Sequence, residues 1–226
     1  MNQKSLAIIT ARGGSKRIPR KNIKDFCGKP IMAYSIEAAL EAGCFDTVMV
    51  STDDEEIAQI AKKYGAEVPF LRSDFATTAD VLMEVFEEYE KRGEKFDHAA
   101  CIYPTAPFVT AQKLKAGMSL LQEKQGTMLM PVVAFSFPPQ RGVVKKGEFL
   151  EFCYPQYRNS RSQDLETMYH DCGQFYCYDV EKYRSVRGQI DTGIIPYIVS
   201  ELEVQDIDNE TDWKLAEMKY RMMKGE

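Results

Sequence analysis

Short apolar runs alternate with helical patterns along most of this chain, and this alternation constrains the fold more than any other feature. Runs of strand length occupy residues 5–11, 46–50, 98–103 and 127–135. Stretches with the 3.6-residue spacing of one helical face occupy residues 31–42, 51–64, 81–89 and 111–121. Such alternation predicts an α/β fold whose mainly parallel, Rossmann-like sheet carries helices on both faces.

The alternation stops at residue 136. Residues 136–169 hold several prolines and aromatic residues but no clear helix, and this stretch is too long for a plain connection. We expect a β-rich excursion that protrudes from a single domain spanning residues 1–226, and that covers a site or pairs with a second copy. Regular structure is expected to resume with strands at 173–178 and 195–200 and a helix at 212–223.

Charge and hydropathy exclude several classes of partner. The net charge is -5, whereas a nucleic-acid binding protein usually has a basic surface. No apolar run reaches the roughly 18 residues that a membrane helix needs, and no secretory leader is visible. The six cysteines show no CxxC spacing. We therefore expect a cytoplasmic protein with reduced cysteines that binds neither nucleic acid nor membrane.

The first expected strand leads into a strongly basic loop. Residues 12–29 contain seven Lys or Arg and one acid, Asp25. The two glycines at 13–14 let the backbone approach an anion closely, and Arg12, Lys16 and Lys21 supply positive charge. Ligands of parallel sheets bind at the carboxyl ends of strands, where this loop lies. The loop matches neither Walker A nor the GxGxxG fingerprint. It predicts a phosphate site, and the alternative is a solvated basic loop.

A second candidate is the pair Asp206 and Asp208. Residues that alternate along an extended segment point to one side, so the two carboxylates suit Mg²⁺ beside a phosphate site. The alternative is a helix start with Asp208 or Thr211 as its cap. Taken alone, the pair does not decide between these readings.

Other strand ends carry weaker signals. Thr105 in the segment Tyr103–Pro107 offers a hydroxyl to a ligand, although the prolines also suit a plain turn. Arg72 could reach a base carbonyl or pair with Asp74. A dense set of polar and aromatic residues favours sugar recognition or an interface rim, namely Arg158, Arg161, Gln163, Tyr169, His170, Asp171 and Gln174.

Several blocks together resemble the CMP-sialic acid synthetase (acylneuraminate cytidylyltransferase) family. The first is Ile9-Thr10-Ala11-Arg12-Gly13-Gly14-Ser15-Lys16 with Lys21-Asn22 and Gly28-Lys29-Pro30. Ser51-Thr52-Asp53, Tyr103-Pro104-Thr105-Ala106-Pro107 and Asp206-Ile207-Asp208 follow in the family's order. The resemblance spans nearly the whole chain.

The resemblance implies a nucleotidyltransferase that moves CMP from CTP to the anomeric hydroxyl of a nonulosonic acid, with Mg²⁺, and releases pyrophosphate. It implies that CTP is bound by Arg12, Gly13, Ser15, Lys16, Lys21, Asn22, Arg72, Tyr103 and Thr105. It implies catalytic roles for Arg12, Lys21, Asp206 and Asp208, the two aspartates holding Mg²⁺. Residues 136–169 would form the dimerisation segment of a homodimer, and the sugar would meet Arg158, Arg161, Gln163, Tyr169, Asp171, Gln174 and Phe175.

Two departures from the family pattern bear on the acceptor sugar. The usual Tyr-x-x-Asn-Gly-Ala block is Tyr169-His170-Asp171-Cys172-Gly173-Gln174 here, and Tyr103 replaces a usual Gln. Both resemble the branch of the family that acts on pseudaminic acid, with N-acylneuraminate or legionaminate as alternative acceptors. The segment 73–80 is also shorter than the corresponding segment of the family. A different class, a nucleotide-binding protein without activity, remains the alternative because fold does not determine function.

Overall fold

The computed structural model describes residues 3–73 and 77–225. Its main sheet has seven strands, six of them in the order β11-β6-β10-β5-β1-β4. The bounds are β1 Ser5–Thr10, β4 Thr47–Ser51, β5 His98–Ile102, β6 Met128–Ala134, β10 Phe175–Asp179 and β11 Ile194–Ile198. The short strand β9, Tyr169–Asp171, pairs with the far half of β6. The strands therefore lie close to where the apolar runs predicted them.

The sheet is mainly parallel. Strand β1 is parallel to β4 and β5, and β11 is parallel to β6. Strand β10 is antiparallel to both β5 and β6, so β5 and β6 share a direction. Among the described strands of this sheet, only β9 and β10 run the opposite way. This confirms the predicted sheet, although the apolar pattern did not indicate the reversed strand because periodicity carries no direction.

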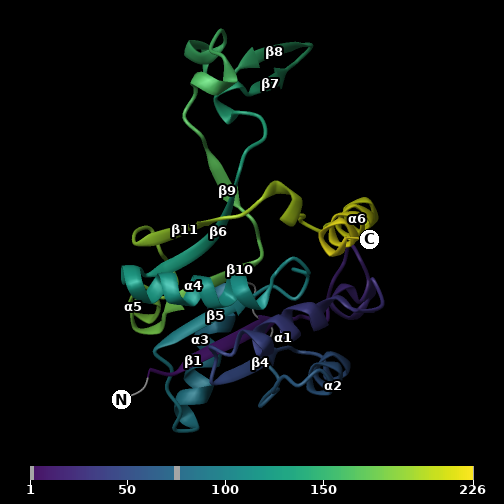
Figure 1. Cartoon of the computed structure of the whole chain (residues 1–226), viewed down its shortest axis with the longest axis vertical. Helices are drawn as coiled ribbons and strands as arrows, with labels where there is room; N and C mark the ends of the chain where they lie inside the picture. The colour runs from purple at the N-terminus through teal and green to yellow at the C-terminus, as the bar shows by residue number, and fades with distance from the viewer. Residues whose placement is uncertain (1–2, 74–76, 226) are drawn as a thin grey trace.

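Helices cover both faces of the sheet, as predicted (Figure 1). On one face α1 Ile31–Ala42, α2 Glu55–Lys63 and α4 Ala111–Lys124 pack against Ala7 and Ile9 of β1. On the other face α3 Thr78–Lys91 and α5 Val180–Ser185 pack against Leu6 and Ile8. Alternate side chains of β1 are thus buried on opposite sides, which explains its continuous apolar run.

The last helix, α6 Glu210–Lys224, packs away from the sheet on a third cluster that includes Phe26 and Trp213, whose rings meet edge to face at 5.6 Å. This packing brings the preceding segment over the basic loop. Asn209 caps α6 and forms a capping box with Asp212. The alternative cap at Asp208 or Thr211 is therefore wrong, and Asp208 has no capping role.

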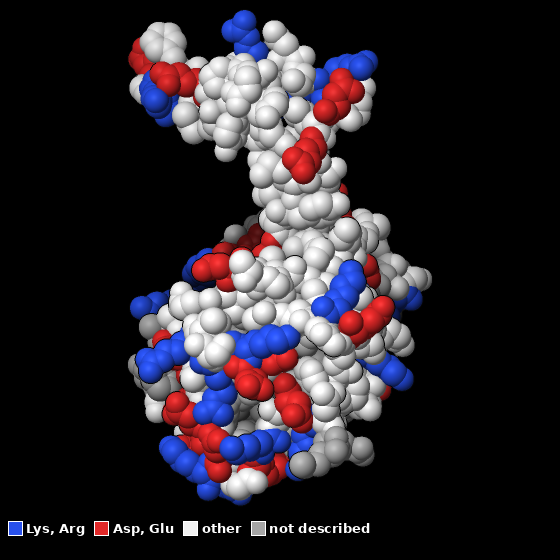
Figure 2. Space-filling model, turned by 90° about the vertical axis from the view of Figure 1, so that its left-hand side faces the viewer, with Lys and Arg blue, Asp and Glu red and all other residues white. Residues whose placement is uncertain are grey.

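Residues 136–169, here called the projecting segment, extend from the body on a narrow neck (Figures 1 and 2). They contain the antiparallel hairpin of β7 Val143–Lys146 and β8 Phe149–Phe152, with the short 3-10 helices η2 Pro139–Arg141, η3 Pro155–Tyr157 and η4 Ser162–Asp164. The hairpin confirms a β-containing excursion. Within residues 3–73 and 77–225, no helix combines the length and apolar character needed to cross a membrane.

Candidate active site

Two adjoining cavities open at the carboxyl ends of β1, β5 and β6. The first, the loop cavity, has a volume of about 550 Å³ and is lined by the basic loop, Arg72 and the start of α3. The second, the neck cavity, has a volume of about 580 Å³ and is lined by residues of β6 and β9, by Gly173 and Tyr176, and by Glu201 and residues 204–206. Tyr103 and Thr105 line both, so the two cavities meet at the end of β5.

The loop cavity gathers almost all of the predicted CTP-binding residues. Its lining includes Arg12, Ser15, Lys16, Lys21, Asn22, Arg72, Tyr103 and Thr105. Gly13 lies behind this lining, where its N–H donates to Asp53 Oδ1 at 2.8 Å. The side chain of Asn22 donates to the carbonyl of Arg12 at 2.8 Å and so ties the two ends of the loop together. Residues from four separate segments of the chain thus converge on one cavity.

The loop's seven cations divide into two groups. Arg20 forms a two-pronged contact with Asp54, at 2.5 and 3.1 Å, and also binds Glu56. The Arg20 guanidinium lowers the pKa of the Asp54 carboxyl below its usual value. Lys24 pairs with Glu210 and Lys29 with Glu37. The remaining four cations, Arg12, Lys16, Arg17 and Lys21, line the cavity and can face phosphates.

Gly13 is required by the close approach of Asp54. A Cβ at this position would lie 2.7 Å from Asp54 Oδ2, an atom held in place by Arg20. We predict that Gly13→Ala lowers the free energy of unfolding by about 1–3 kcal/mol and weakens CTP binding, because the loop must shift. Urea unfolding and CTP titration would measure both effects.

Gly14→Ala is the matched control. A Cβ at Gly14 meets no atom within 4 Å, and Gly14 is not among the glycines with positive φ. Equal destabilisation by both substitutions would contradict the close-approach argument and would indicate a general need for loop freedom.

Asp206 and Asp208 each connect to one of the two cavities. Asp206 lines the neck cavity, while Asp208 pairs at 2.5 Å with Arg17 of the loop cavity. Lys21 Nζ donates to the carbonyl of Ile207, between the two aspartates, at 2.6 Å. Burial lowers the pKa of Lys21, although the charges of Asp208 and Asp206 oppose this shift.

This donor set fits Mg²⁺. Magnesium is usually held by one or two carboxylates, with phosphate oxygens and waters completing its shell. Among residues 3–73 and 77–225 no group of three or more His, Cys, Asp or Glu could hold a metal without such help. Asp206 and Asp208 would therefore bind Mg²⁺ together with a nucleotide in the loop cavity, as the sequence pattern predicts.

Arg72 has an unsatisfied donor. Its backbone N–H donates to the carbonyl of Thr52 at 2.9 Å, whereas its buried side-chain Nε has no hydrogen-bond partner among the described residues. A buried donor at a cavity wall is available to a ligand acceptor. The alternative partner Asp74 lies outside the described residues, as does part of the stretch 73–80.

The predicted sugar residues separate into three groups. Asp171 lines the neck cavity, together with His170, whose ring packs on Phe135 at 4.7 Å. Tyr169 lies one residue before this lining on β9, half-exposed. Gln174 is buried beneath the cavity and donates to the carbonyl of Glu203 at 2.5 Å.

Phe175 corrects the sequence prediction. Its side chain is fully buried in the core beside α4. Neighbouring residues of a strand point to opposite faces of the sheet, so Phe175 points away from the face that carries Tyr176. It therefore belongs to the core and not to the sugar pocket. Arg158, Arg161 and Gln163 lie in the projecting segment, which the neck separates from the body of the same chain (Figure 1).

Sequence reasoning missed Thr77, Thr78, Tyr176 and Lys219, which also line the two cavities. Thr77 caps α3 by accepting from the N–H of Asp80, so the Thr-x-x-Asp spacing signalled a helix start at this point. Lys219 lies far along α6, and no local pattern connects it to β9. The packing of α6 against the body brings Lys219 to the neck cavity.

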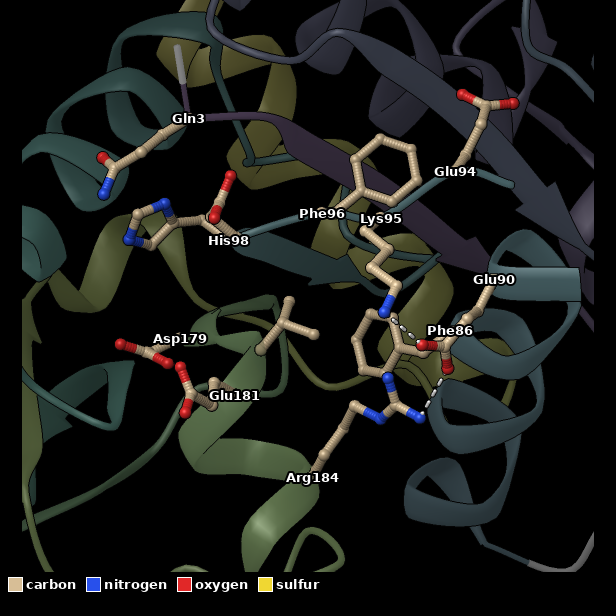
Figure 3. A pocket seen from close by; sticks show the side chains of 12 residues that line it. Gln3, Phe86, Glu90, Glu94, Lys95, Phe96, His98, Asp179, Glu181 and Arg184 are labelled. Atoms are coloured by element: carbon tan, nitrogen blue, oxygen red, sulfur yellow. Dashed lines mark hydrogen bonds and ion pairs between the residues drawn. The ribbon is translucent and has the colours of Figure 1, made fainter. Parts of the chain in front are cut away.

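A third cavity, of about 500 Å³, lies at the opposite end of the sheet (Figure 3). Most of its charged groups are already paired with one another or with backbone. Glu90 binds both Lys95, at 2.7 Å, and Arg184, at 2.9 Å. Asp179 caps α5 by accepting from the N–H of Lys182. These pairs leave it without the cation cluster of the loop cavity.

Comparison with known proteins decides the family. The family model described as "Cytidylyltransferase" matches residues 6–174, which include the basic loop, β5 and β9. The chain belongs to the cytidylyltransferase family. It is thus a member of a family of enzymes, and the predicted resemblance is confirmed.

Individual cytidylyltransferases extend this assignment over the whole chain. The chain is 38% identical to the pseudaminic acid cytidylyltransferase of Campylobacter jejuni, with 97% of each chain covered. It is 32% identical to the CMP-N,N'-diacetyllegionaminic acid synthase of Legionella pneumophila, with 94% of each covered. A CMP:2-keto-3-deoxy-manno-octonic acid synthetase complexed with CTP shares the fold, with a TM-score of 0.73 at 18% identity and 99% and 100% coverage.

Proposed function

We propose that this cytidylyltransferase uses Mg²⁺ to transfer CMP from CTP to the anomeric hydroxyl of pseudaminic acid, with release of pyrophosphate. The observation that carries the proposal is the pair of adjoining cavities, with Asp206 in the lining of the neck cavity and Asp208 paired with Arg17 of the loop cavity. The loop cavity has the cations for a triphosphate, and the neck cavity has room for a second substrate. The names of the relatives support this acceptor.

The chemistry is a displacement at the α-phosphorus of CTP. The sugar oxygen forms a bond to the α-phosphorus, the bond to the β-phosphate oxygen breaks, and the hydroxyl proton is lost. Arg12, Lys16 and Lys21 hold the phosphates and stabilise charge on the departing pyrophosphate. Bound Mg²⁺ would neutralise phosphate oxygens and orient the α-phosphoryl group. Alignment across the two cavities supplies much of the acceleration.

The neck cavity is short of positive charge for an acidic sugar. Three acids line it, Asp171, Glu201 and Asp206, and Lys219 is the one Lys or Arg among its lining residues. Lys219 Nζ already donates to the carbonyl of Val204 at 2.7 Å. The carboxylate of a nonulosonic acid therefore requires cations from elsewhere, and Mg²⁺ and a second copy of the chain supply them.

The projecting segment has the surface of an interface. It exposes Phe137 (85%), Phe149 (77%) and Leu150 (67%), and Figure 2 shows a surface mostly without charge. Exposed apolar groups of this density are costly in a monomer and mark an interaction site. In a homodimer this segment would cover its partner, and Arg158 and Arg161 would reach the partner's neck cavity.

We predict that the double substitution Phe149→Asp and Leu150→Asp yields a folded monomer. Charges in the exposed apolar patch would oppose its burial against a partner, while the core of the body is untouched. Light scattering would report the mass, and the KM for the sugar should rise far more than that for CTP. Lys146→Ala, which removes an exposed partner of Glu151 on the same hairpin, serves as the control. A double variant that stays dimeric would contradict this interface.

The function itself is tested by pyrophosphate release from CTP with Mg²⁺ and a panel of nonulosonic acids. The expected result is turnover that is fastest with pseudaminic acid. Faster turnover with N-acylneuraminate or legionaminate would replace the acceptor and keep the reaction. If the protein binds CTP but releases no pyrophosphate with any of the acceptors, the result would favour a nucleotide-binding protein without activity.

A further inference from the structure

The two segments that depart from the family pattern, at Tyr103 and within residues 169–174, both contribute to the lining of the neck cavity. Tyr103 follows β5, Asp171 ends β9, and Tyr176 lies in β10. All three line this cavity, and Tyr103 also lines the loop cavity. The rings of Tyr103 and Tyr176 meet edge to face with centroids 5.5 Å apart. Tyr103 and Tyr176 are therefore in contact inside the cavity that Asp171 also lines.

Sheet register explains why these side chains meet. Tyr176 lies opposite Cys101, and the N–H of Tyr103 continues the ladder by donating to the carbonyl of Gln174 at 2.8 Å. Tyr103 and Tyr176 are consequently diagonal neighbours on one face of an antiparallel pair, a spacing within reach of aromatic rings. Strand β9 then carries Asp171 to the same edge.

Asp171 is held by two neutral donors. The hydroxyl of Tyr176 donates to Asp171 Oδ2 at 2.6 Å, and the N–H of Gly173 donates to Oδ1 at 2.9 Å. Tyr176 is only 6% exposed. Burial, together with the contact to Asp171, raises the pKa of Tyr176, so its phenol stays protonated and donates. Within the described ranges no Lys, Arg or His forms an ion pair with Asp171.

The pair presents an oriented carboxylate to the cavity. Both oxygens are fixed by donors, and their remaining lone pairs can accept further hydrogen bonds from a ligand. A carboxylate attracts N–H and O–H donors and repels another carboxylate. An acidic sugar would therefore turn its own carboxylate away from Asp171 and its donor groups toward it.

We propose that Asp171, positioned by Tyr176, reads the acylamino N–H groups of the acceptor sugar and so selects and orients it. This inference rests on the proposed function, since it concerns the acceptor of that reaction. Tyr103 packs against Tyr176 at the junction of the cavities, where the sugar and the nucleotide meet. The three side chains thereby connect the site that selects the acceptor with the junction of the two cavities at the end of β5.

The test compares steady-state kinetics of Asp171→Asn and Tyr176→Phe with an acceptor bearing two acylamino groups and with one bearing a single such group. Asp171→Asn keeps the shape but loses one acceptor oxygen, and Tyr176→Phe keeps the ring but frees Oδ2. We expect Asp171→Asn to raise the KM of the doubly substituted acceptor about 10- to 100-fold and Tyr176→Phe about 3- to 10-fold, with the KM for CTP changed less than about twofold. The preference between the two acceptors should shrink in both variants.

Matched controls separate recognition from stability. Tyr89→Phe removes a buried hydroxyl that has no hydrogen-bond partner among the described residues, and Asp97→Asn alters a carboxylate that accepts a backbone N–H, from Lys4, at the opposite end of the sheet. Thermal unfolding would confirm that all four variants fold. Variants that behave like their controls, or that raise the KM of CTP and of both acceptors equally, would overturn this inference while an active wild type keeps the proposed function. A wild type that turns over no acceptor would overturn both.

Discussion

Asp208→Ala should lower kcat by about 10³-fold or more while the protein remains folded. The substitution removes one of the two carboxylates available to Mg²⁺ and leaves Arg17 without its partner at 2.5 Å. It should spare the start of α6, because Asn209 and Asp212 form the cap. Pyrophosphate release measures the rate, and circular dichroism checks the fold.

The metal assignment has its own control and readout. Glu210→Ala removes an acid two residues away that pairs with Lys24 outside the cavity, and it should retain nearly full activity. Chelation should stop the wild type, and added Mg²⁺ should restore it. Direct Mn²⁺ titration should show weaker binding to Asp208→Ala in the presence of CTP. Near-normal turnover of that variant would exclude Asp208 as a metal ligand.

Lys21→Ala should lower the rate about 100-fold or more, because Lys21 lines the loop cavity beside the two aspartates and in the proposed reaction would supply charge to the phosphates. Lys24→Ala is the control, since Lys24 belongs to the loop but pairs with Glu210. An equal, small loss in both variants would mean that Lys21 only adds to a general basic surface.

The pH dependence of this effect has a definite sign. Burial lowers the pKa of Lys21, so its ammonium loses its proton at a lower pH than an ordinary lysine. Activity of the wild type should therefore decline on the alkaline side before a free lysine would titrate, and Lys21→Ala should lack this decline. The same shift means that folding disfavours the charged form, so the contribution of Lys21 to stability improves as the pH rises.

Local patterns predicted the elements and most of the loop cavity. Burial of alternate residues in β1 and the one-sided faces of the helices depend on neighbours only a few positions away. The basic loop could be placed at a strand end for the same reason. Pairing of distant residues could not be predicted: Arg20 binds Asp54, and Lys24 binds Glu210, 186 residues further along the chain. Hence the sequence did not show which cations face the cavity.

The sequence by itself determined the α/β class and the family, and it predicted the phosphate loop and the Asp206–Asp208 pair, because each lies in a contiguous pattern whose chemistry is local. Only the tertiary structure decided that Phe175 lies in the core, that β10 runs against its neighbours, and that Asp171, Tyr176 and Tyr103 share one cavity. The physical reason is that strand pairing and helix packing, and not spacing along the chain, set which side chains converge.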